Sequence, residues 1–586
     1  MRLKSYGRFP FLEELLFMRL FFLCRFYIQE GPKNLVNGKR SRYTYFCEGT
    51  ERMNRLRNPI EKLSYYRYGF TLATLICTAV SGWLLGGEAV YAEESPQSIS
   101  TSQIKVDPRI QEFTLENGWK FIVMPRHETP TISFYTYADV GSSQEVKGIT
   151  GAAHLLEHLA FKGTPEVGTT DYTKEKLALE ALDQAYAALE EERSKGEKAD
   201  SARVEELMQA FVQAQAEAGQ YVVQNEFGSV VESFGGTGLN ASTSPDRTDY
   251  FFSLPSNAAE LWFYLESGRF YEPVFREFYK ERDVVTEERR MRTESSPIGF
   301  AIEEMLAAAY KAHPYGEPTV GHYGDLRAMT PPKVMDFFKT HYVPSNMISV
   351  IVGDITLERA QALAKAYFER IPARPRPAEI STVEPEQNVE KCLTLHLQSQ
   401  PIYLEGYHRP SINHPDDVVY DALISILSEG RSSRLYRSLV RDRQLAIAAQ
   451  GMSGEPGLKY PTLVLFYAVP APGHSNEEVA AALHEELDKL IQTPVTEEEL
   501  NGVKSRVRYA LVSSLTTNSG WASLLGNYQG LTGDWRNLFK TIEKIERVTP
   551  EDIQRVARET FRPTNRTAVY IETAMQEGSN PVLSKE

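Results

Sequence analysis

The most constraining feature of the sequence is the segment 151–161, which reads GAAHLLEHLAF. Its other side chains are small or apolar around the whole helix, and such a helix is buried. His154, Glu157 and His158 are the exceptions, and buried polar side chains without partners cost on the order of several kcal/mol each. The chain must therefore fold so that this helix lies inside a core and its three polar side chains find a partner.

The spacing of the two histidines favours a metal ion as that partner. His154 and His158 are at i and i+4, so they project from one helical face about a turn apart. Glu157 lies beside that face, where it could take a proton from metal-bound water. This is the H-x-x-E-H arrangement, the inverse of the H-E-x-x-H zinc motif. The alternative is a helix end at which the histidines cap or hydrogen-bond, and the buried surroundings disfavour it.

A catalytic zinc site needs a third protein ligand and one open position. In the helix predicted over 276–291, Glu281 and Glu288 share one stripe with apolar residues at 3-4-3 spacing. Glu287 lies about 100° away and is expected in solvent. Glutamates on an inward stripe again need a partner, which could be the same metal. The spacing alone also allows a wet face on which neighbouring arginines neutralise these glutamates.

Further short patterns occur at wide intervals along the chain. They are Gly151-x-Ala-His, Phe161-Lys-Gly-Thr164, Gly238-x-Asn240-Ala241-x-Thr243, Asp246-x-Thr248-x-Tyr250, His313-Pro-Tyr315-Gly316, Tyr342-x-Pro344-x-Asn346, Gly353-Asp354 and Gly430-Arg431-Ser-Ser-Arg434-Leu435-Tyr436. With His154-x-x-Glu157-His158 and Glu281-Arg-Asp-Val-Val-x-x-Glu288, this set resembles the pitrilysin/insulinase family of zinc peptidases. Shorter members of that family are similar to the mitochondrial processing peptidase beta subunit. The resemblance covers about residues 105–575.

The resemblance implies specific roles for residues of the first half. It makes His154, His158 and Glu288 the ligands of one zinc ion per chain. It makes Glu157 the general base that activates the zinc-bound water. Glu281 becomes a carboxylate that orients a ligating imidazole.

Substrate contacts are also implied by the resemblance. Asn240 and Ala241 would lie on an edge strand to which an extended peptide adds by main-chain hydrogen bonds. Arg441 is a candidate for an arginine that larger members place near the substrate. The position seven residues later is Ala448, so no catalytic tyrosine is assigned.

Strands and helices alternate in the same rhythm in both halves, which predicts two related α+β domains. The predicted strands cover 113–125 as a hairpin, 131–140, 235–254, 347–352, 392–398, 401–407, 444–452, 461–469 and 566–572. The predicted helices cover 151–161, 257–269, 275–292, 356–370, 415–427, 476–492, 496–515 and 549–560. We expect a catalytic domain at 105–375 and a second, inactive peptidase-like domain at 390–575, separated by a Pro-rich stretch. Each is expected to be a mostly antiparallel sheet covered by helices, and the two to face each other across a cavity.

An insertion interrupts the first domain. Residues 174–219 are rich in alanine, glutamate and lysine and predict an exposed helical hairpin. Gly196 separates its two helices, and Asp200 or Ser201 can cap the second. The insertion accounts for an interval between His158 and Glu288 that is longer than is usual in the family.

The first 92 residues are typical of a targeting region. They carry a net charge of +7, and residues 70–87 after the basic run hold no charge. The small residues before Glu93 predict a secretory signal cleaved after Ala92, while an uncleaved anchor at 70–87 is the alternative. We expect translation to begin at Met53, which would leave out residues 1–52; the alternative is a longer organellar targeting sequence. Residues 93–104 are a polar linker, and we expect an exported, periplasmic or extracytoplasmic protein.

Charge and cysteine content exclude several classes of function. The net charge is −14, and residues 93–586 alone carry −21, which argues against nucleic acid as a partner. Cys392 is the one cysteine after residue 92, which excludes a disulfide framework and cysteine-ligated zinc in this part.

The sequence thus predicts an exported zinc endopeptidase that hydrolyses unfolded or short peptides. We expect it to act as a homodimer or as a heterodimer with a related subunit, with a membrane contact only through its N-terminal segment. A non-catalytic peptide-binding or assembly subunit of the same fold is the alternative. A protein with a purely structural metal site is a weaker alternative, because such a site has no need of a general base such as Glu157.

Overall fold

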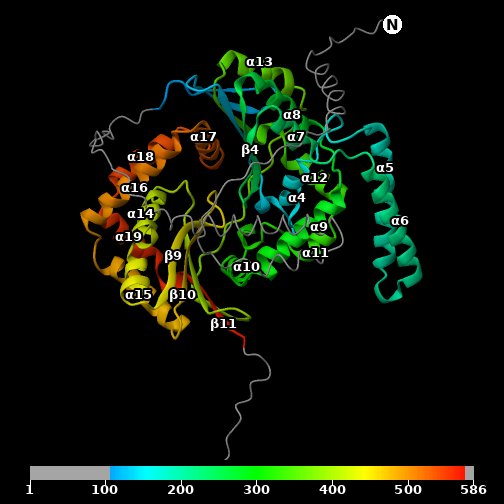
Figure 1. The fold of residues 1–586 in the computed structure, drawn as a ribbon. Helices are drawn as coiled ribbons and strands as arrows, with labels where there is room; N and C mark the ends of the chain where they lie inside the picture. Colours follow the sequence, from blue (N-terminus) through cyan, green and yellow to red (C-terminus); the bar gives the residue numbers. More distant parts are fainter. Residues whose placement is uncertain (1–105, 575–586) are drawn as a thin grey trace, which may run out of the picture. The chain divides into compact units, whose positions relative to one another are not determined.

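The structure is a computed structural model of the chain and describes residues 106–574 (Figure 1). The predictions for the targeting region 1–92 and the linker 93–104 lie outside the described residues. Within residues 106–574 no helix is long and apolar enough to cross a membrane. The described residues belong to one compact unit, and the domain boundary expected near 371–390 stays a prediction.

The first half of the described chain builds a six-stranded sheet in the order β1-β2-β6-β3-β5-β4. Its strands are β1 (Gln111–Thr114), β2 (Lys120–Pro125), β3 (Thr131–Ala138), β4 (Thr237–Thr243), β5 (Thr248–Pro255) and β6 (Met347–Gly353). β2 and β6 run parallel, and all other neighbours are antiparallel. β4 lies at one edge and pairs with β5 alone among the described strands.

The second half builds a five-stranded sheet in the order β7-β11-β8-β10-β9. Its strands are β7 (Lys391–Leu397), β8 (Ile402–Arg409), β9 (Ala446–Glu455), β10 (Thr462–Pro470) and β11 (Arg566–Thr573). Only β7 and β11 are parallel neighbours in this sheet. This order matches β2-β6-β3-β5-β4 strand for strand, with the parallel pair in the same place. The prediction of two related α+β halves with mostly antiparallel sheets is confirmed.

Helices surround both sheets. The first half contains α4 (Ala152–Leu159), α5 (Tyr172–Arg193), α6 (Ser201–Gly219), α7 (Glu226–Ser233), α8 (Ala259–Tyr271), α9 (Phe278–Arg289), α10 (Pro297–Ala309), α11 (Tyr323–Arg327), α12 (Pro331–His341) and α13 (Leu357–Phe368). The second half contains α14 (Asp417–Ser428), α15 (Asn476–Gln492), α16 (Glu497–Ser514), α17 (Asn518–Thr532), α18 (Asn537–Arg547) and α19 (Pro550–Thr560). Helices α7, α10, α11, α12, α17 and α18 were not predicted from the sequence.

Each half contributes one helix to the sheet of the other half. α17 packs on β3 and β6, where Trp521 and Leu525 join the apolar side chains of that face. This contact depends on Gly526, because a Cβ atom there would lie 2.6 Å from the ring of Tyr135. In return, α10 packs on β7, β8 and β11. The two halves therefore share their cores and support each other.

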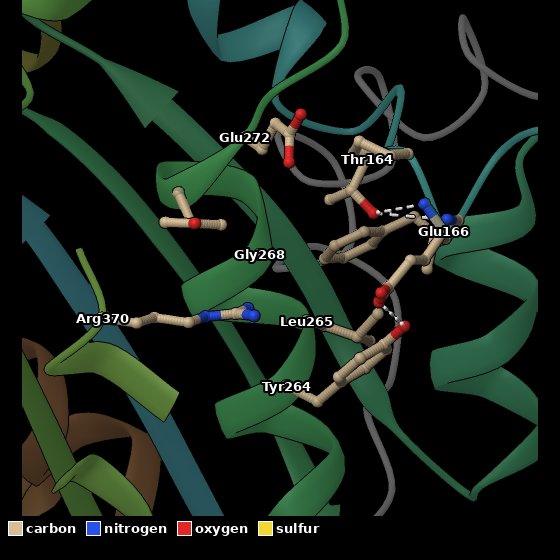
Figure 2. A pocket seen from close by; sticks show the side chains of 11 residues that line it. Thr164, Glu166, Tyr264, Leu265, Gly268, Glu272 and Arg370 are labelled. Atoms are coloured by element: carbon tan, nitrogen blue, oxygen red, sulfur yellow. Dashed lines mark hydrogen bonds between the residues drawn. The ribbon is translucent and has the colours of Figure 1, made fainter. Parts of the chain in front are cut away.

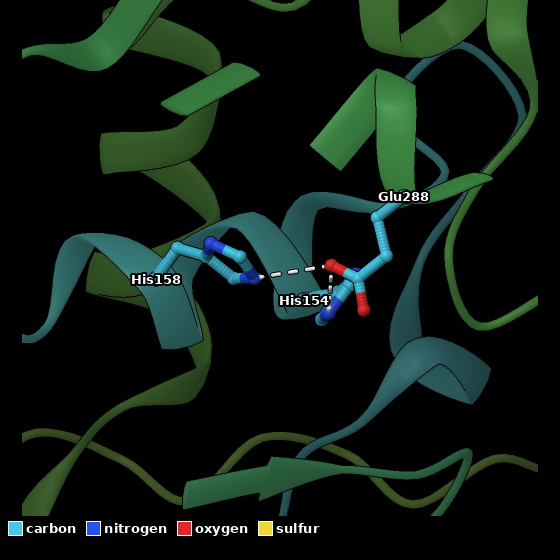
Figure 3. A group of neighbouring side chains, drawn as sticks. All are labelled: His154, His158 and Glu288. Atoms are coloured by element: carbon cyan, nitrogen blue, oxygen red, sulfur yellow. Dashed lines mark ion pairs between the residues drawn. The ribbon is translucent and has the colours of Figure 1, made fainter. Parts of the chain in front are cut away.

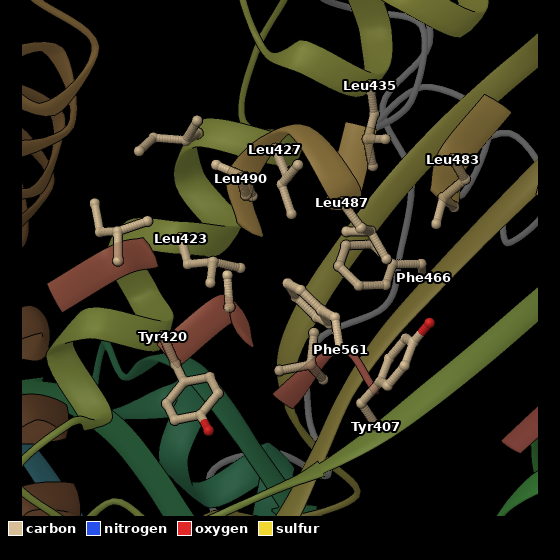
Figure 4. Packing of buried hydrophobic residues seen from close by; sticks show 14 of the residues in the cluster. Tyr407, Tyr420, Leu423, Leu427, Leu435, Phe466, Leu483, Leu487, Leu490 and Phe561 are labelled. Carbon is tan, nitrogen blue, oxygen red and sulfur yellow. The ribbon is translucent and has the colours of Figure 1, made fainter. Parts of the chain in front are cut away.

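The counterpart of α4 in the second half is filled by packing. α4 follows β3, and α14 follows β8, the strand that matches β3. Leu423 and Leu427 of α14 are fully buried and lie among Phe466, Leu487 and their neighbours (Figure 4). α14 carries no histidine, so this half has no counterpart of the H-x-x-E-H motif at the equivalent helix.

The predicted helical hairpin is present as α5 and α6, which contact each other. Gly196 lies between them, and the Asp200 carboxylate caps α6 by accepting hydrogen bonds from its first turn. One face of α5 is less exposed than expected: Leu182, Tyr186 and Leu189 are buried. The insertion is thus packed against the first half, where Tyr186 contacts Tyr279 of α9.

Candidate metal centre

The start of α4 is fixed by Gly151 and by the carboxylate of Glu145, which precedes it in the sequence. Gly151 adopts a φ of 90°, and a Cβ atom there would lie 2.7 Å from the Val320 carbonyl oxygen and from the Leu326 side chain. Only glycine fits this left-handed, crowded position. The buried Glu145 accepts hydrogen bonds of 2.7 Å from the backbone N–H groups of Gly151 and Ala153. These contacts hold the helix that carries the H-x-x-E-H motif.

The three predicted ligands converge between α4 and α9 (Figure 3). One donor atom from each of His154, His158 and Glu288 lies within 4.8 Å of the others. Oε2 of Glu288 is 3.7 Å from Nε2 of His154 and 3.5 Å from Nε2 of His158. Both distances are longer than a hydrogen bond. Ligands of a tetrahedral zinc ion with bonds of about 2.1 Å lie about 3.4 Å apart, so this donor set fits one zinc ion.

The protonation states of the group also suit a metal ion. Burial lowers the pKa of His154 to about 4, which leaves its ring neutral. Burial opposes the charge of Glu288, but the two histidines and Arg292 lower the pKa of this carboxyl to about 2. Burial likewise disfavours charge on His158, but the carboxylates of Glu281 and Glu288 raise its pKa to about 9. A bound metal would replace the His158 proton, since ligating imidazoles are neutral.

Glu157 lies on the same helix with one oxygen already held. Its Oε2 accepts a 2.6 Å hydrogen bond from the Thr243 hydroxyl at the end of β4. Burial raises the pKa of Glu157, and the Thr243 bond works in the opposite direction. Among the described residues, Thr243 is the one side chain that donates to this carboxylate, and Oε1 remains available. Sequence reasoning assigned Thr243 no role, although it closes the pattern that contains Asn240 and Ala241.

Glu281 lies beside the ligand group, as its stripe on the helix predicts. Its side chain is 12% exposed and that of Glu288 is 17% exposed, whereas Glu287 is 60% exposed. Exposure to solvent therefore holds for Glu287 only, although the largely buried Glu288 also pairs with Arg292 at 2.6 Å. Oε2 of Glu281 lies 3.4 Å from Nδ1 of His158. This is the ring nitrogen opposite to the one that faces Glu288, so Glu281 can orient the imidazole.

The predicted substrate-binding residues lie in two different places. Asn240 and Ala241 belong to the edge strand β4, beside α4. Arg441 lies in the π-helical segment Tyr436–Asp442, where it pairs with Asp442 at 2.6 Å and is 54% exposed. Within residues 106–574 no hydrogen bond or ion pair joins Arg441 to the ligand group. The structure therefore brings Asn240 and Ala241 to the candidate site, and the role of Arg441 stays a prediction.

A pocket lined in part by α8 is too small for a peptide. It has a volume of about 70 Å³ and is lined by Thr164, Tyr264, Gly268, Arg370 and neighbouring side chains (Figure 2). Ligand sites occupy about 300–1,000 Å³. Its polar lining is already engaged, since the Tyr264 hydroxyl donates to Glu166. This pocket is therefore no candidate for a peptide site.

Comparison with known proteins identifies the family. The profile described as "Insulinase (Peptidase family M16)" matches residues 121–218 and 217–322, and "Peptidase M16 inactive domain" matches residues 328–507. The zinc protease PqqE of Helicobacter pylori is 30% identical over 482 residues, which cover 79% of this chain and 93% of that protein. The chain belongs to the M16 (insulinase) family of peptidases. The match of the second half to the inactive domain agrees with its packed α14.

Solved M16 structures share this fold. A protease from Helicobacter pylori is 28% identical with a TM-score of 0.66 and covers 79% of this chain and 100% of its own. The first half of the periplasmic protease PqqL from Escherichia coli has a TM-score of 0.59 at 18% identity, with coverage of 80% and 94%. At that identity the PqqL likeness supports the fold alone. The two-domain α+β architecture is thus shared with solved relatives.

Proposed function

We propose that this protein is a zinc-dependent endopeptidase that hydrolyses unfolded or short peptides. The observation that carries the proposal is the convergence of His154, His158 and Glu288 next to Glu157, whose carboxyl is close enough for His158 and Glu288 to shift its pKa. Relatives named zinc proteases support the metal and the reaction class.

The donors of His154, His158 and Glu288 would hold the zinc ion. When bound, zinc supplies a Lewis acid that polarises the scissile carbonyl and acidifies the attacking water. Glu157 takes the proton of that water on Oε1 and delivers it to the departing amine nitrogen. Thr243 keeps Oε2 in place while the proton moves, and Glu281 holds the ring of His158.

The peptide would bind as an additional strand on β4. That strand is unpaired on its outer side among the described residues, and extended peptides add to such edges through backbone hydrogen bonds. Asn240 and Ala241 would contact the peptide there, three and two residues before Thr243 on the same strand. This mode requires an extended backbone, which accounts for a preference for unfolded or short substrates.

The intact Glu157 favours catalysis over the alternative of a non-catalytic peptide-binding or assembly subunit. A binding subunit has no use for a buried carboxylate that is held at one oxygen and free at the other. Assembly into a homodimer or with a related subunit remains part of the proposal, because a second chain could enclose the substrate. So does export, supported by the apolar run 70–87 and by a relative described as periplasmic.

A peptide library tests the proposal. The purified full chain is incubated with a mixture of unstructured peptides, with and without chelator, and cleavage products are identified by mass spectrometry. We expect cleavage that chelator abolishes and added zinc restores. A folded, zinc-loaded protein that cleaves no peptide would contradict the peptidase assignment and favour the binding subunit.

A further inference from the structure

Lys162 makes a contact that no step of the proposed reaction uses. It follows α4 in the sequence, and its ammonium group lies 2.6 Å from Oε1 of Glu281 and 2.9 Å from Oε2 of Glu277. All three side chains are largely buried, with 21% of Lys162 and 12% of each glutamate exposed. Charge-assisted bonds in such surroundings are stronger than those in water. Lys162 is therefore a fixed group between the end of α4 and the start of α9.

We propose that Lys162 is a positioning residue for the metal centre, an inference that rests on the proposed zinc site. Glu281 has two oxygens and uses one for each neighbour: Oε1 for Lys162 and Oε2 for Nδ1 of His158. Lys162 thereby fixes the rotation of the carboxylate, and the carboxylate fixes the imidazole. His154 has no such support, because its Nδ1 is buried without a hydrogen-bond partner. The orientation of His158 thus depends on the link through Glu281 to Lys162.

Glu277 anchors the other side of Lys162. It precedes α9 with a φ of 54°, a left-handed conformation that is unusual for a residue with a side chain. Its carboxylate accepts from Lys162, from Gln224 after the helical hairpin and from Lys280 on α9. Three donors from three segments hold this strained position in place. Glu277 therefore sets where α9 begins relative to α4, and Lys162 joins the end of α4 to α9 in addition to the contact between His158 and Glu281.

If Lys162 acts only as a nearby charge, its removal should strengthen metal binding, whereas if it positions Glu281, its removal should weaken metal binding. Loss of a cation near a divalent metal site reduces repulsion and favours metal binding. Loss of a positioning contact frees Glu281 and weakens metal binding, typically by about 10–100-fold for the partners of ligands. Lys280 provides a matched control, since it is a lysine on the same Glu277 carboxylate but makes no ion pair with Glu281 among the described residues.

The test measures zinc affinity of the metal-free full chain by competition with a chromophoric chelator. We expect Lys162→Met to weaken zinc binding by about tenfold or more. Lys162→Arg, which keeps the charge and the donors, retains most of the affinity, and Lys280→Met binds zinc as tightly as the unaltered protein or slightly tighter. Melting temperatures of all variants are recorded, and a loss of affinity counts only in variants whose melting temperature is within a few degrees of the parent.

Several results would overturn the inference. They are unchanged or tighter zinc binding by Lys162→Met, equal weakening by Lys280→Met, failure of Lys162→Arg to retain affinity, and unfolding of Lys162→Met, which would give Lys162 a purely structural role. The readout needs no peptide. A parent protein that binds zinc without cleaving peptides removes the proposed reaction but leaves this test intact, and a parent that binds no zinc removes both.

Discussion

Arg276 anchors the helical hairpin to the segment that follows the zinc motif, and its removal has a calculable cost. Arg276 and Glu175 are both 0% exposed, and Nε of Arg276 lies 2.7 Å from Oε1 of Glu175. The same guanidinium donates to the backbone carbonyl oxygens of Lys162, Thr164 and Val167 at 2.9, 2.6 and 3.0 Å. One side chain thus pairs with one oxygen of a buried carboxylate and with three carbonyls, while Oε2 of Glu175 is buried without a hydrogen-bond partner.

Replacement of Arg276 by methionine keeps the apolar stem but leaves Glu175 buried without its cation. Breaking one side of a buried ion pair costs about 3–5 kcal/mol, and carbonyls that lose donors add to this. We expect Arg276→Met to lower the free energy of unfolding by about 4 kcal/mol. A second substitution, Glu175→Met, removes the unpaired carboxylate, so the double variant should be more stable than Arg276→Met alone.

Equilibrium urea denaturation followed by circular dichroism measures these free energies. Arg193→Met is the control, because Arg193 belongs to the same hairpin but pairs with Glu190 at the surface, where ion pairs are worth about 0–1 kcal/mol. A loss below about 1 kcal/mol in Arg276→Met, or additive losses in the double variant, would refute the reasoning that this buried pair anchors the insertion.

Three further substitutions separate the roles within the site. Glu288→Gln should weaken zinc binding by about a hundredfold or more, whereas Glu287→Gln on the exposed side should leave it unchanged; equal effects would contradict the ligand assignment. Thr243→Val should lower kcat about tenfold, the worth of one hydrogen bond to a charged group, with zinc affinity preserved and Thr243→Ser close to normal; a normal kcat in Thr243→Val would disprove the contact's importance. Gly151→Ala should destabilise the protein by about 2 kcal/mol, and an unchanged melting temperature would argue against the crowded left-handed turn.

The local parts of the site could be predicted from the sequence because they depend on short-range periodicity. The i and i+4 spacing of His154 and His158 sets their common face, and the 3-4-3 spacing of α9 places Glu281 and Glu288 on one stripe. Whether that stripe was wet or buried could not be decided from spacing. Only the packing of α9 against α4 distinguishes Glu288 from its exposed neighbour Glu287.

The remaining features depend on contacts between distant segments, which leave no periodic signal. Lys162 and Glu277 are ordinary charged residues in the sequence and become linked only when α4 and α9 meet. The exchange of α10 and α17 between the two sheets is equally invisible, although Ser296 and Pro297 at the start of α10 are a recognisable helix signal. The role of Arg441 was assigned by resemblance alone, and its exposed position beside Asp442 leaves that role a prediction.

The most direct test of the central claim is the rate of peptide cleavage by Glu157→Gln, measured together with its zinc content. The amide keeps the shape of the side chain and removes its ability to accept a proton. The account predicts one zinc ion per chain, as in the unaltered protein, and a cleavage rate lower by about 10²–10⁴-fold. Undiminished cleavage by zinc-loaded Glu157→Gln would contradict the account, because the reaction would then have another base or another site.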